Sequence, residues 1–209
     1  MEKKKNIFVR FANVWYYYKF YVLIGIILII ALIVGINSCF FRESYDLSIL
    51  YITSEDTDRF SHSEDVLNKI ETFVSDINGD GKANAEIITI SYGQTQAEQQ
   101  SAAASRAANI AYGKALFYIL DEQNYQQLKE GGFLEDISTL GQSQYLEQYR
   151  FCINDSKIFN SIDGFSDISE KYYFCIRTYD KSKAENEKNF QIQYDSAVST
   201  LTNIINEYK

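Results

Sequence analysis

The chain contains no proline and only one histidine, and this composition limits both its backbone geometry and its possible chemistry. Without proline, no helix is kinked by that residue and no turn depends on a cis-proline bond. His62 lies in an expected helix cap, which argues against a nucleophile–base pair, and no histidine-rich metal set exists. Gly-x-Ser-x-Gly elbows, Walker loops and dinucleotide fingerprints are also absent. We therefore predict that the protein is not an enzyme; a cell-wall glycosidase using two acids is the weaker alternative.

Acidic residues outnumber basic residues outside the N-terminus. Residues 1–19 hold five basic residues against one acidic residue, a net charge of +4, and the whole chain carries −8. Residues 20–209 therefore carry −12. This balance argues against nucleic acid as a partner, because phosphate binding needs clustered Lys and Arg. The basic segment instead fits a tail that lies against anionic lipid of a bilayer.

Charged residues are also missing between Lys19 and Arg42. This run is long enough to span the hydrocarbon of a bilayer as a helix, and aromatic residues flank it. The basic excess before it predicts that the N-terminus lies inside the cell. We predict a single-pass protein of the cytoplasmic membrane with a cytoplasmic tail (1–16), a signal-anchor helix (17–38), a short stalk (39–46) and an extracellular domain (47–209).

The three cysteines fall in two contexts. Cys39 follows the apolar run in a stretch that loosely resembles a lipoprotein box, so a lipidated, cleaved chain is an alternative to the uncleaved anchor. Both readings place the domain on the same side of the membrane. Cys152 and Cys175 lie in expected strands, where a disulfide is one reading and two buried free thiols are the other.

Strand and helix patterns alternate through the extracellular domain. Strands are expected at 47–52, 85–91, 115–120, 150–153 and 172–177. Helices are expected after the capping boxes at 61–64 and 95–98, after Asp121, and in the C-terminal tail. The order predicts an α/β fold: a three-layer α/β/α lobe with a mostly parallel sheet. Alanines of the second helix are expected to pack closely on that sheet: Ala103, Ala107 and Ala111.

The arrangement as a whole resembles a known kind of protein. A basic aromatic tail and an apolar span precede YDLSILYIT, DINGDGKANAEIITISYG, ALFYILDEQNYQQLKEGGFLEDIS and a late YYFCIRTYD. It is similar to uncharacterised membrane-anchored proteins of clostridia-type Gram-positive bacteria, whose outer domain resembles one lobe of a type II periplasmic solute-binding protein. The resemblance implies a solute-binding-like lobe. The domain is too short for two lobes and a hinge, so capture by a closing clamshell is not expected.

A small-molecule site in such a sheet is expected at the carboxyl ends of its parallel strands. Polar residues follow those ends, and an aromatic ring among them is suited to stacking on a sugar or another ring. The candidate ligand-binding residues are Ser54, Glu55, Tyr92 and Asp121.

The segment DINGDGKAN contains a candidate calcium loop. Its oxygen-bearing residues alternate as in an EF-hand loop, with glycine at the sixth position. The closing acid of that pattern is missing, because Ile87 occupies its position. The alternative is a metal-free turn, which Asn-Gly and Asp-Gly form readily. A bound Ca²⁺ would be structural and weakly held, and its candidate ligands are Asp76, Asn78, Asp80, Lys82 and Asn84.

These expectations converge on a binding or accessory module at the outer face of the membrane. Its expected partners are the lipid bilayer, a membrane protein beside it and a small-molecule ligand. The alternative is a structural or docking component of an envelope complex that has lost ligand binding.

Overall fold

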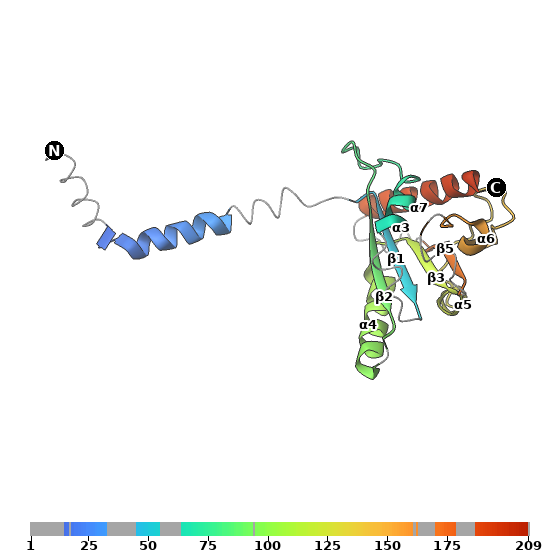
Figure 1. Ribbon diagram of the computed structural model, residues 1–209, viewed down its shortest axis with the longest axis horizontal. Coiled ribbons are helices and arrows are strands. Elements are labelled where there is room, and N and C mark those ends of the chain that lie inside the picture. Colours follow the sequence, from blue (N-terminus) through green and yellow to red (C-terminus); the bar gives the residue numbers. More distant parts are fainter. Residues whose placement is uncertain are drawn as a thin grey trace. The chain divides into compact units, whose positions relative to one another are not determined.

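The computed structural model divides into two units, Met1–Ser44 and Tyr45–Lys209. The sheet and its helices belong to the second unit (Figure 1). The residues that the structure describes are 15–16, 18–32, 45–54, 64–93, 95–160, 162, 170–178 and 187–208.

Five strands form one mixed sheet in the order β2-β1-β3-β5-β4. The strand β1 (Leu47–Thr53) pairs in parallel with β2 (Ala85–Ser91) and with β3 (Phe117–Asp121). The strand β5 (Tyr172–Ile176) pairs antiparallel with β3 and with the short β4 (Phe151–Cys152). Every residue of β1, β3 and β5 is buried, as expected for strands covered on both faces.

The predicted α/β class is confirmed, but the prediction of a mostly parallel sheet is wrong at β4 and β5. Two of the four strand pairings are antiparallel. A parallel neighbour needs a long crossover, usually a helix that packs on the sheet. In the described residues between β4 and β5, the helix is the four-residue α6 (Ile153–Ser156). Within its described residues, this connection therefore holds no helix long enough to pack along the sheet as a parallel crossover does.

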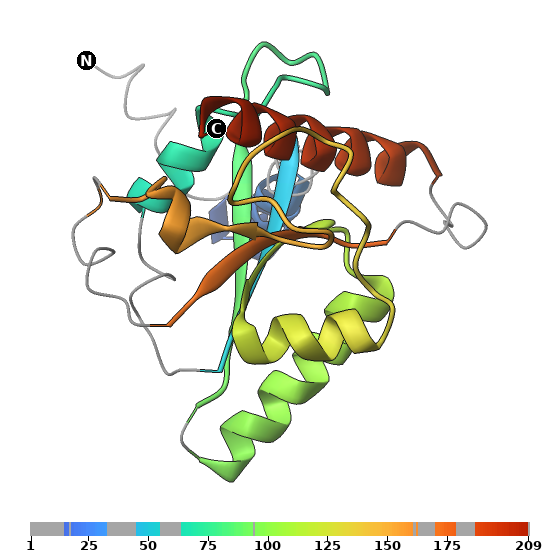
Figure 2. The same cartoon turned by 90° about the vertical axis from the view of Figure 1, so that its right-hand side faces the viewer.

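Helices cover both faces of the sheet (Figure 2). The helices α3 (Glu64–Glu71) and α7 (Glu187–Glu207) contribute to the core on one face, together with α6. The helices α4 (Gln96–Tyr112) and α5 (Glu122–Glu130) contribute to the core on the other face. The structure therefore has helices, sheet and helices in successive layers.

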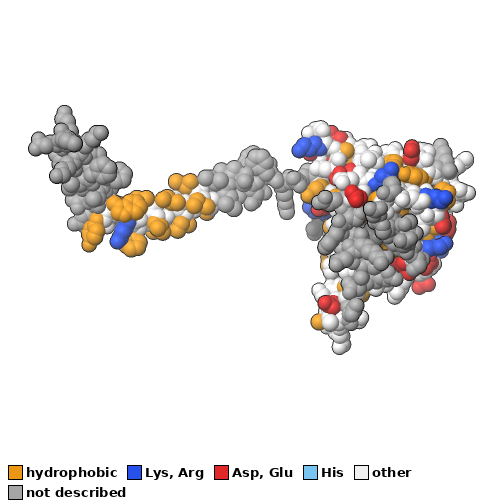
Figure 3. Space-filling view, in the orientation of Figure 1, with side chains coloured by type: hydrophobic (Ala, Val, Ile, Leu, Met, Phe, Trp, Pro, Cys, Tyr) orange, Lys and Arg blue, Asp and Glu red, His pale blue; other side chains and the backbone are white. Residues whose placement is uncertain are grey.

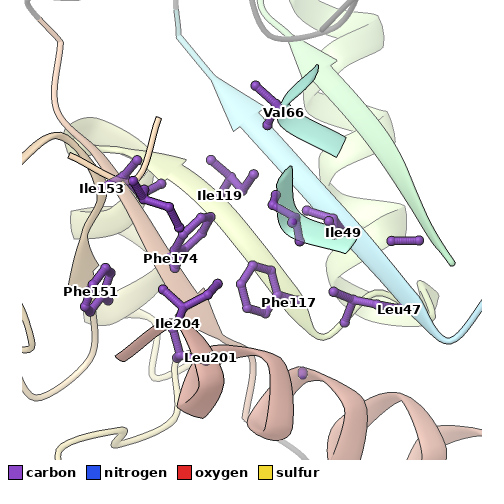
Figure 4. Close-up of a cluster of buried hydrophobic side chains, with 14 of the residues drawn as sticks. Leu47, Ile49, Val66, Phe117, Ile119, Phe151, Ile153, Phe174, Leu201 and Ile204 are labelled. Carbon is purple, nitrogen blue, oxygen red and sulfur yellow. The ribbon is translucent and has the colours of Figure 1, made fainter. Parts of the chain in front are cut away.

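The larger core lies between the sheet and α7 (Figure 4). The rings of Phe117 and Phe174, on neighbouring strands, have centroids 5.1 Å apart, and Leu201 of α7 packs in the same cluster. Successive residues of a strand point to opposite faces, so Ile49 enters this core while Leu50 enters the core beside α4 and α5. Burial of each such side chain stabilises the fold by roughly 1.5–3 kcal/mol.

Two helix starts predicted from the sequence are confirmed. Thr95 caps α4 through a reciprocal capping box with Glu98. Asp121 ends β3 and caps α5, where its carboxylate accepts from the backbone N–H of Asn124 at 2.7 Å. Such caps satisfy donors that the first turn of a helix leaves unpaired. The third predicted cap involves residues 61–63, which lie outside the described residues.

The helix α4 is largely exposed, so the prediction that its alanines pack on the sheet is wrong. Ala103, Ala107 and Ala111 are exposed, and Ala102 is the buried residue of this helix. Tyr112, at its C-terminus, is 88% exposed. Alanine has the highest helix propensity of any residue, so an alanine-rich segment forms a helix whether or not a neighbour covers it.

The first unit contains an apolar helical stretch at residues 18–32. From Phe20 to Leu32 every large apolar side chain is exposed, and Lys19 is the charged residue of the stretch (Figure 3). Within the described ranges, no helix is long and apolar enough to cross a membrane. The predicted anchor, 17–38, continues past Leu32 into residues outside those ranges.

Candidate functional site

A polar pocket lies near the carboxyl ends of the parallel strands. After β1 the chain turns to α3 on one face of the sheet, and after the adjacent β3 it turns to α5 on the opposite face. Divergence of this kind leaves a crevice between two strand ends, where α/β proteins commonly bind ligands. The pocket has a volume of about 260 Å³. It is lined by Ser54, Tyr92, Gln99, Arg106, Gln123, Asn124 and Gln127.

Asp121 organises the floor of this pocket. Its side chain is 1% exposed, and it accepts hydrogen bonds from the backbone N–H of Ser54 and from both the backbone and the side-chain amide of Asn124. The Asn124 amide also donates to the Ser54 hydroxyl at 3.1 Å. A buried carboxylate is stable only when donors surround it, and three N–H groups meet that need here. Asp121 thereby ties the end of β1 to the start of α5.

Arg106 supplies the charge of the pocket wall. It extends from α4, and its Nη1 donates to Gln127 Oε1 at 2.6 Å and to the Tyr92 hydroxyl at 3.3 Å. These bonds connect three elements across the pocket: the end of β2, the helix α4 and the helix α5. Arg106 as a residue is half-buried, so its charge is screened less than that of a fully solvated cation.

The structure brings together three of the four predicted ligand-binding residues. Ser54 and Tyr92 line the pocket, and Asp121 lies beneath it. Glu55 lies outside the described residues. Arg106 was not predicted from the sequence, although one signal for it was present: it is the sole basic residue of an alanine-rich helix. The amide-bearing lining residues were not predicted either, because glutamine and asparagine are ordinary on exposed helix surfaces: Gln99, Gln123, Asn124 and Gln127.

The candidate calcium loop is a compact turn held by its own polar side chains. The carboxylate of Asp76 accepts from the N–H of Gly79 at 2.6 Å and of Gly81 at 2.8 Å. Asn78 and Asp80 each accept from the N–H two residues onward. Both glycines have positive φ, at 78° and 86°, a conformation that other residues rarely adopt. Local sequence therefore determines the shape of this loop.

One residue fastens the loop to the sheet. Asp46, which the sequence analysis placed in the stalk, is fully buried. Its carboxylate accepts from the backbone N–H groups of Ile77, Asn78 and Asn84, at 2.9, 3.0 and 3.2 Å. The folded domain consequently begins before β1.

The loop fits a low-affinity calcium site only in part. Its first oxygen-bearing side chains accept N–H groups of the loop, but Ile87 stands where the closing acid is expected and lies within β2. The neighbouring Glu86 accepts from the Ser48 hydroxyl at 2.7 Å, so it is engaged on the sheet. Across the described residues, no three His, Cys, Asp or Glu side chains are grouped so as to hold a metal. Calcium binding by Asp76, Asn78, Asp80, Lys82 and Asn84 stays a prediction.

Cys152 and Cys175 are free thiols in the same buried cluster. Cys152 pairs with Tyr173 across β4 and β5, so Cys175 lies two residues further along the neighbouring strand, on the same face. Burial raises the pKa of Cys152 to about 11 and that of Cys175 well above its ordinary value. Both thiols therefore stay protonated, and unreactive, at neutral pH. Cys39 lies outside the described residues.

A second polar cluster surrounds Arg150. Its guanidinium lies 4.6 Å from the ring centre of Tyr125 and 4.3 Å from that of Tyr173, and it forms ion pairs with Glu122 and Glu147. Burial alone would raise the pKa of Glu122, but hydrogen bonds from Tyr173 and other neighbours, with the charge of Arg150, lower it overall. Every charge in this cluster has an opposite partner. We assign it a structural role, linking α5 to β5.

The chain matches no protein-family model, no curated protein and no solved structure.

Proposed function

We propose that this protein is a membrane-anchored binding or accessory module whose ligand site is the pocket beside Ser54, Tyr92 and Arg106. The observation that carries the proposal is the position of that pocket. It lies where the connections from two adjacent parallel strands diverge, and polar side chains from four elements converge on it.

The strand arrangement supports a solute-binding-like lobe. The order β2-β1-β3, with helices on both faces, is that of an α/β ligand-binding unit. A lobe that acts alone contacts its ligand from one side. We therefore expect weak binding by the isolated chain, or tighter binding where a neighbouring membrane protein completes the site.

The apolar helical stretch supports the anchor. Residues 20–32 expose their large apolar side chains in all directions, which is costly in water and favourable in lipid. Five basic residues within 1–19 favour a cytoplasmic N-terminus. We propose that the second unit is displayed at the outer face of the cytoplasmic membrane.

A thermal-shift screen of the full-length chain in detergent tests the binding function. The probes are sugars, amino acids and short peptides at millimolar concentration. A ligand of the pocket should raise the unfolding midpoint in a saturable manner, and Tyr92→Ala should abolish the shift. Tyr112→Ala is the matched control, since it removes the same side chain from the exposed end of α4. Silence across the whole screen would remove this proposal.

The second candidate function is docking within an envelope complex, and the exposure of α4 favours it. This helix presents alanines and Tyr112 to solvent over most of its length. A photo-crosslinking residue at Tyr112, in intact membranes, should capture one defined partner if α4 docks. Recovery of monomer alone would count against docking and leave ligand binding as the function.

A further inference from the structure

The pocket contains a cation whose partners are uncharged. Arg106 donates to Tyr92 and Gln127, and no carboxylate within the described ranges forms an ion pair with it. Arg150 differs, because Glu122 and Glu147 neutralise it. An arginine has five N–H donors in a planar fork, and the two bonds of Arg106 share one nitrogen. Most of its donor capacity therefore faces the pocket or the solvent.

Among the described residues that line the pocket, the other side chains offer hydroxyl and amide groups and carry no negative charge. The hydroxyl oxygens of Ser54 and Tyr92 accept bonds from Asn124 and Arg106, which leaves their O–H groups to donate elsewhere. The carboxylate beneath the pocket belongs to Asp121, which is buried and accepts three N–H bonds. A ligand rich in acceptor oxygens would accept hydrogen bonds from these side chains.

We infer that the pocket binds a small organic anion, with an oxyanion of the ligand accepting hydrogen bonds from Arg106. This inference rests on the binding function proposed above and assigns its ligand class. The charge of −12 on residues 20–209 opposes anions at long range. Salt screens that repulsion beyond about 8 Å, however, whereas the guanidinium would touch the ligand directly. The local donor set, rather than the net charge, decides what the pocket selects.

Matched pairs of probes test the inference on the full-length chain in detergent. The pairs are succinate with succinamide and galacturonate with galactose, and inorganic phosphate is a single probe. Binding is measured by titration calorimetry and by the shift in the unfolding midpoint. The variants are Arg106→Gln and Arg106→Lys, with Lys114→Gln as the control, because Lys114 is an exposed cation just after the C-terminus of α4.

We expect at least one anion to bind, and its uncharged counterpart to bind at least about tenfold more weakly. Arg106→Gln should weaken binding of the anion by a similar factor, and Arg106→Lys should weaken it by less. Lys114→Gln should change the affinity by no more than about twofold. Equal affinity for both members of a pair, or unchanged anion binding by Arg106→Gln, overturns the inference. If uncharged probes bind equally well and Tyr92→Ala abolishes that binding, the proposed binding function is retained and the inference that the ligand is an anion is rejected. If no probe binds, both the proposed binding function and the anion inference are overturned.

Discussion

At the scale of single residues, Asp121 connects fold and site. It ends a central strand, caps the next helix and binds the backbone of Ser54 after another strand. Local sequence accounts for the first two roles, since an aspartate before a helix is a common cap. The third role joins residues 67 positions apart, and it places the pocket floor.

Replacing Asp121 with alanine should destabilise the domain by about 2–4 kcal/mol, because a helix cap and hydrogen bonds from buried N–H groups are lost together. Urea unfolding, followed by circular dichroism, measures the change in the free energy of unfolding. Asp65→Ala is the control, since Asp65 is exposed on α3. Equal unfolding midpoints for the two variants would show that Asp121 does not hold the strand ends together.

The Glu122–Arg150 pair should make stability depend on pH. The pKa of Glu122 is lowered in the folded state, so its contribution is present above the unfolded value of 4.5 and is lost as the pH falls through the folded pKa. Its side chain is 42% exposed, so we expect at most about 1 kcal/mol after screening by solvent. Glu122→Gln should therefore lose less stability than the wild type between pH 6 and pH 3.

Urea midpoints at several pH values measure this difference. Glu130→Gln serves as the control, because Glu130 is an exposed acid at the end of the same helix. The wild type and Glu130→Gln should follow parallel curves. Parallel curves for the wild type and Glu122→Gln would contradict the prediction.

At the scale of elements, the segment between α3 and β2 is shaped by its own residues. Two glycines with positive φ and three side chains that accept backbone N–H groups of the same segment form the turn. Asp46 then attaches the turn to the sheet. The remaining prediction for this element is that the loop binds calcium.

The calcium hypothesis predicts a rise in stability of about 1–2 kcal/mol at 5 mM Ca²⁺, if the affinity is that of typical extracellular sites. The rise should be absent in 5 mM Mg²⁺, which prefers a tighter octahedral shell. Asp80→Asn should abolish it, because one carboxylate ligand is lost. Thermal unfolding with and without the cation measures the effect, and an unchanged midpoint in Ca²⁺ would mean that the loop is a metal-free turn.

At the scale of the whole molecule, the proposed anchor would decide where the domain works. The apolar stretch and the basic tail together predict a cytoplasmic N-terminus and an outer domain. The full-length chain should resist extraction from membranes by alkaline carbonate, whereas a chain starting at Tyr45 should be released. A protease added to intact cells should digest residues 45–209.

Replacing Lys3, Lys4 and Lys5 with glutamate should protect part of the population from that protease, because the charge bias that orients the span is removed. Cys39→Ser separates the two readings of the anchor. A mass that changes only by the substitution favours the uncleaved helix, and a larger change in mass favours the lipidated, cleaved chain. Complete protease protection of the wild type would contradict the proposed orientation.

Sequence reasoning succeeded where the deciding residues are neighbours along the chain. The boundaries of β2, the caps at Thr95 and Asp121 and the turn at Gly79–Gly81 depend on residues within a few positions of each other. Sequence reasoning failed where a distant neighbour decides the outcome. The alanines of α4 were expected to pack on the sheet, yet no pattern within the helix indicates how far its neighbours extend.

The amino-acid sequence by itself determined the α/β class, the strand-end positions of Ser54 and Tyr92, and the uneven charge that predicts the anchor. Tertiary structure alone decided that β5 runs antiparallel beside β3, and that Arg106 reaches Tyr92 and Gln127 across the pocket. The physical reason is the distance along the chain over which each interaction acts. Capping, turn geometry and periodicity act over a few residues, whereas strand pairing and a converging pocket depend on how whole elements pack in space.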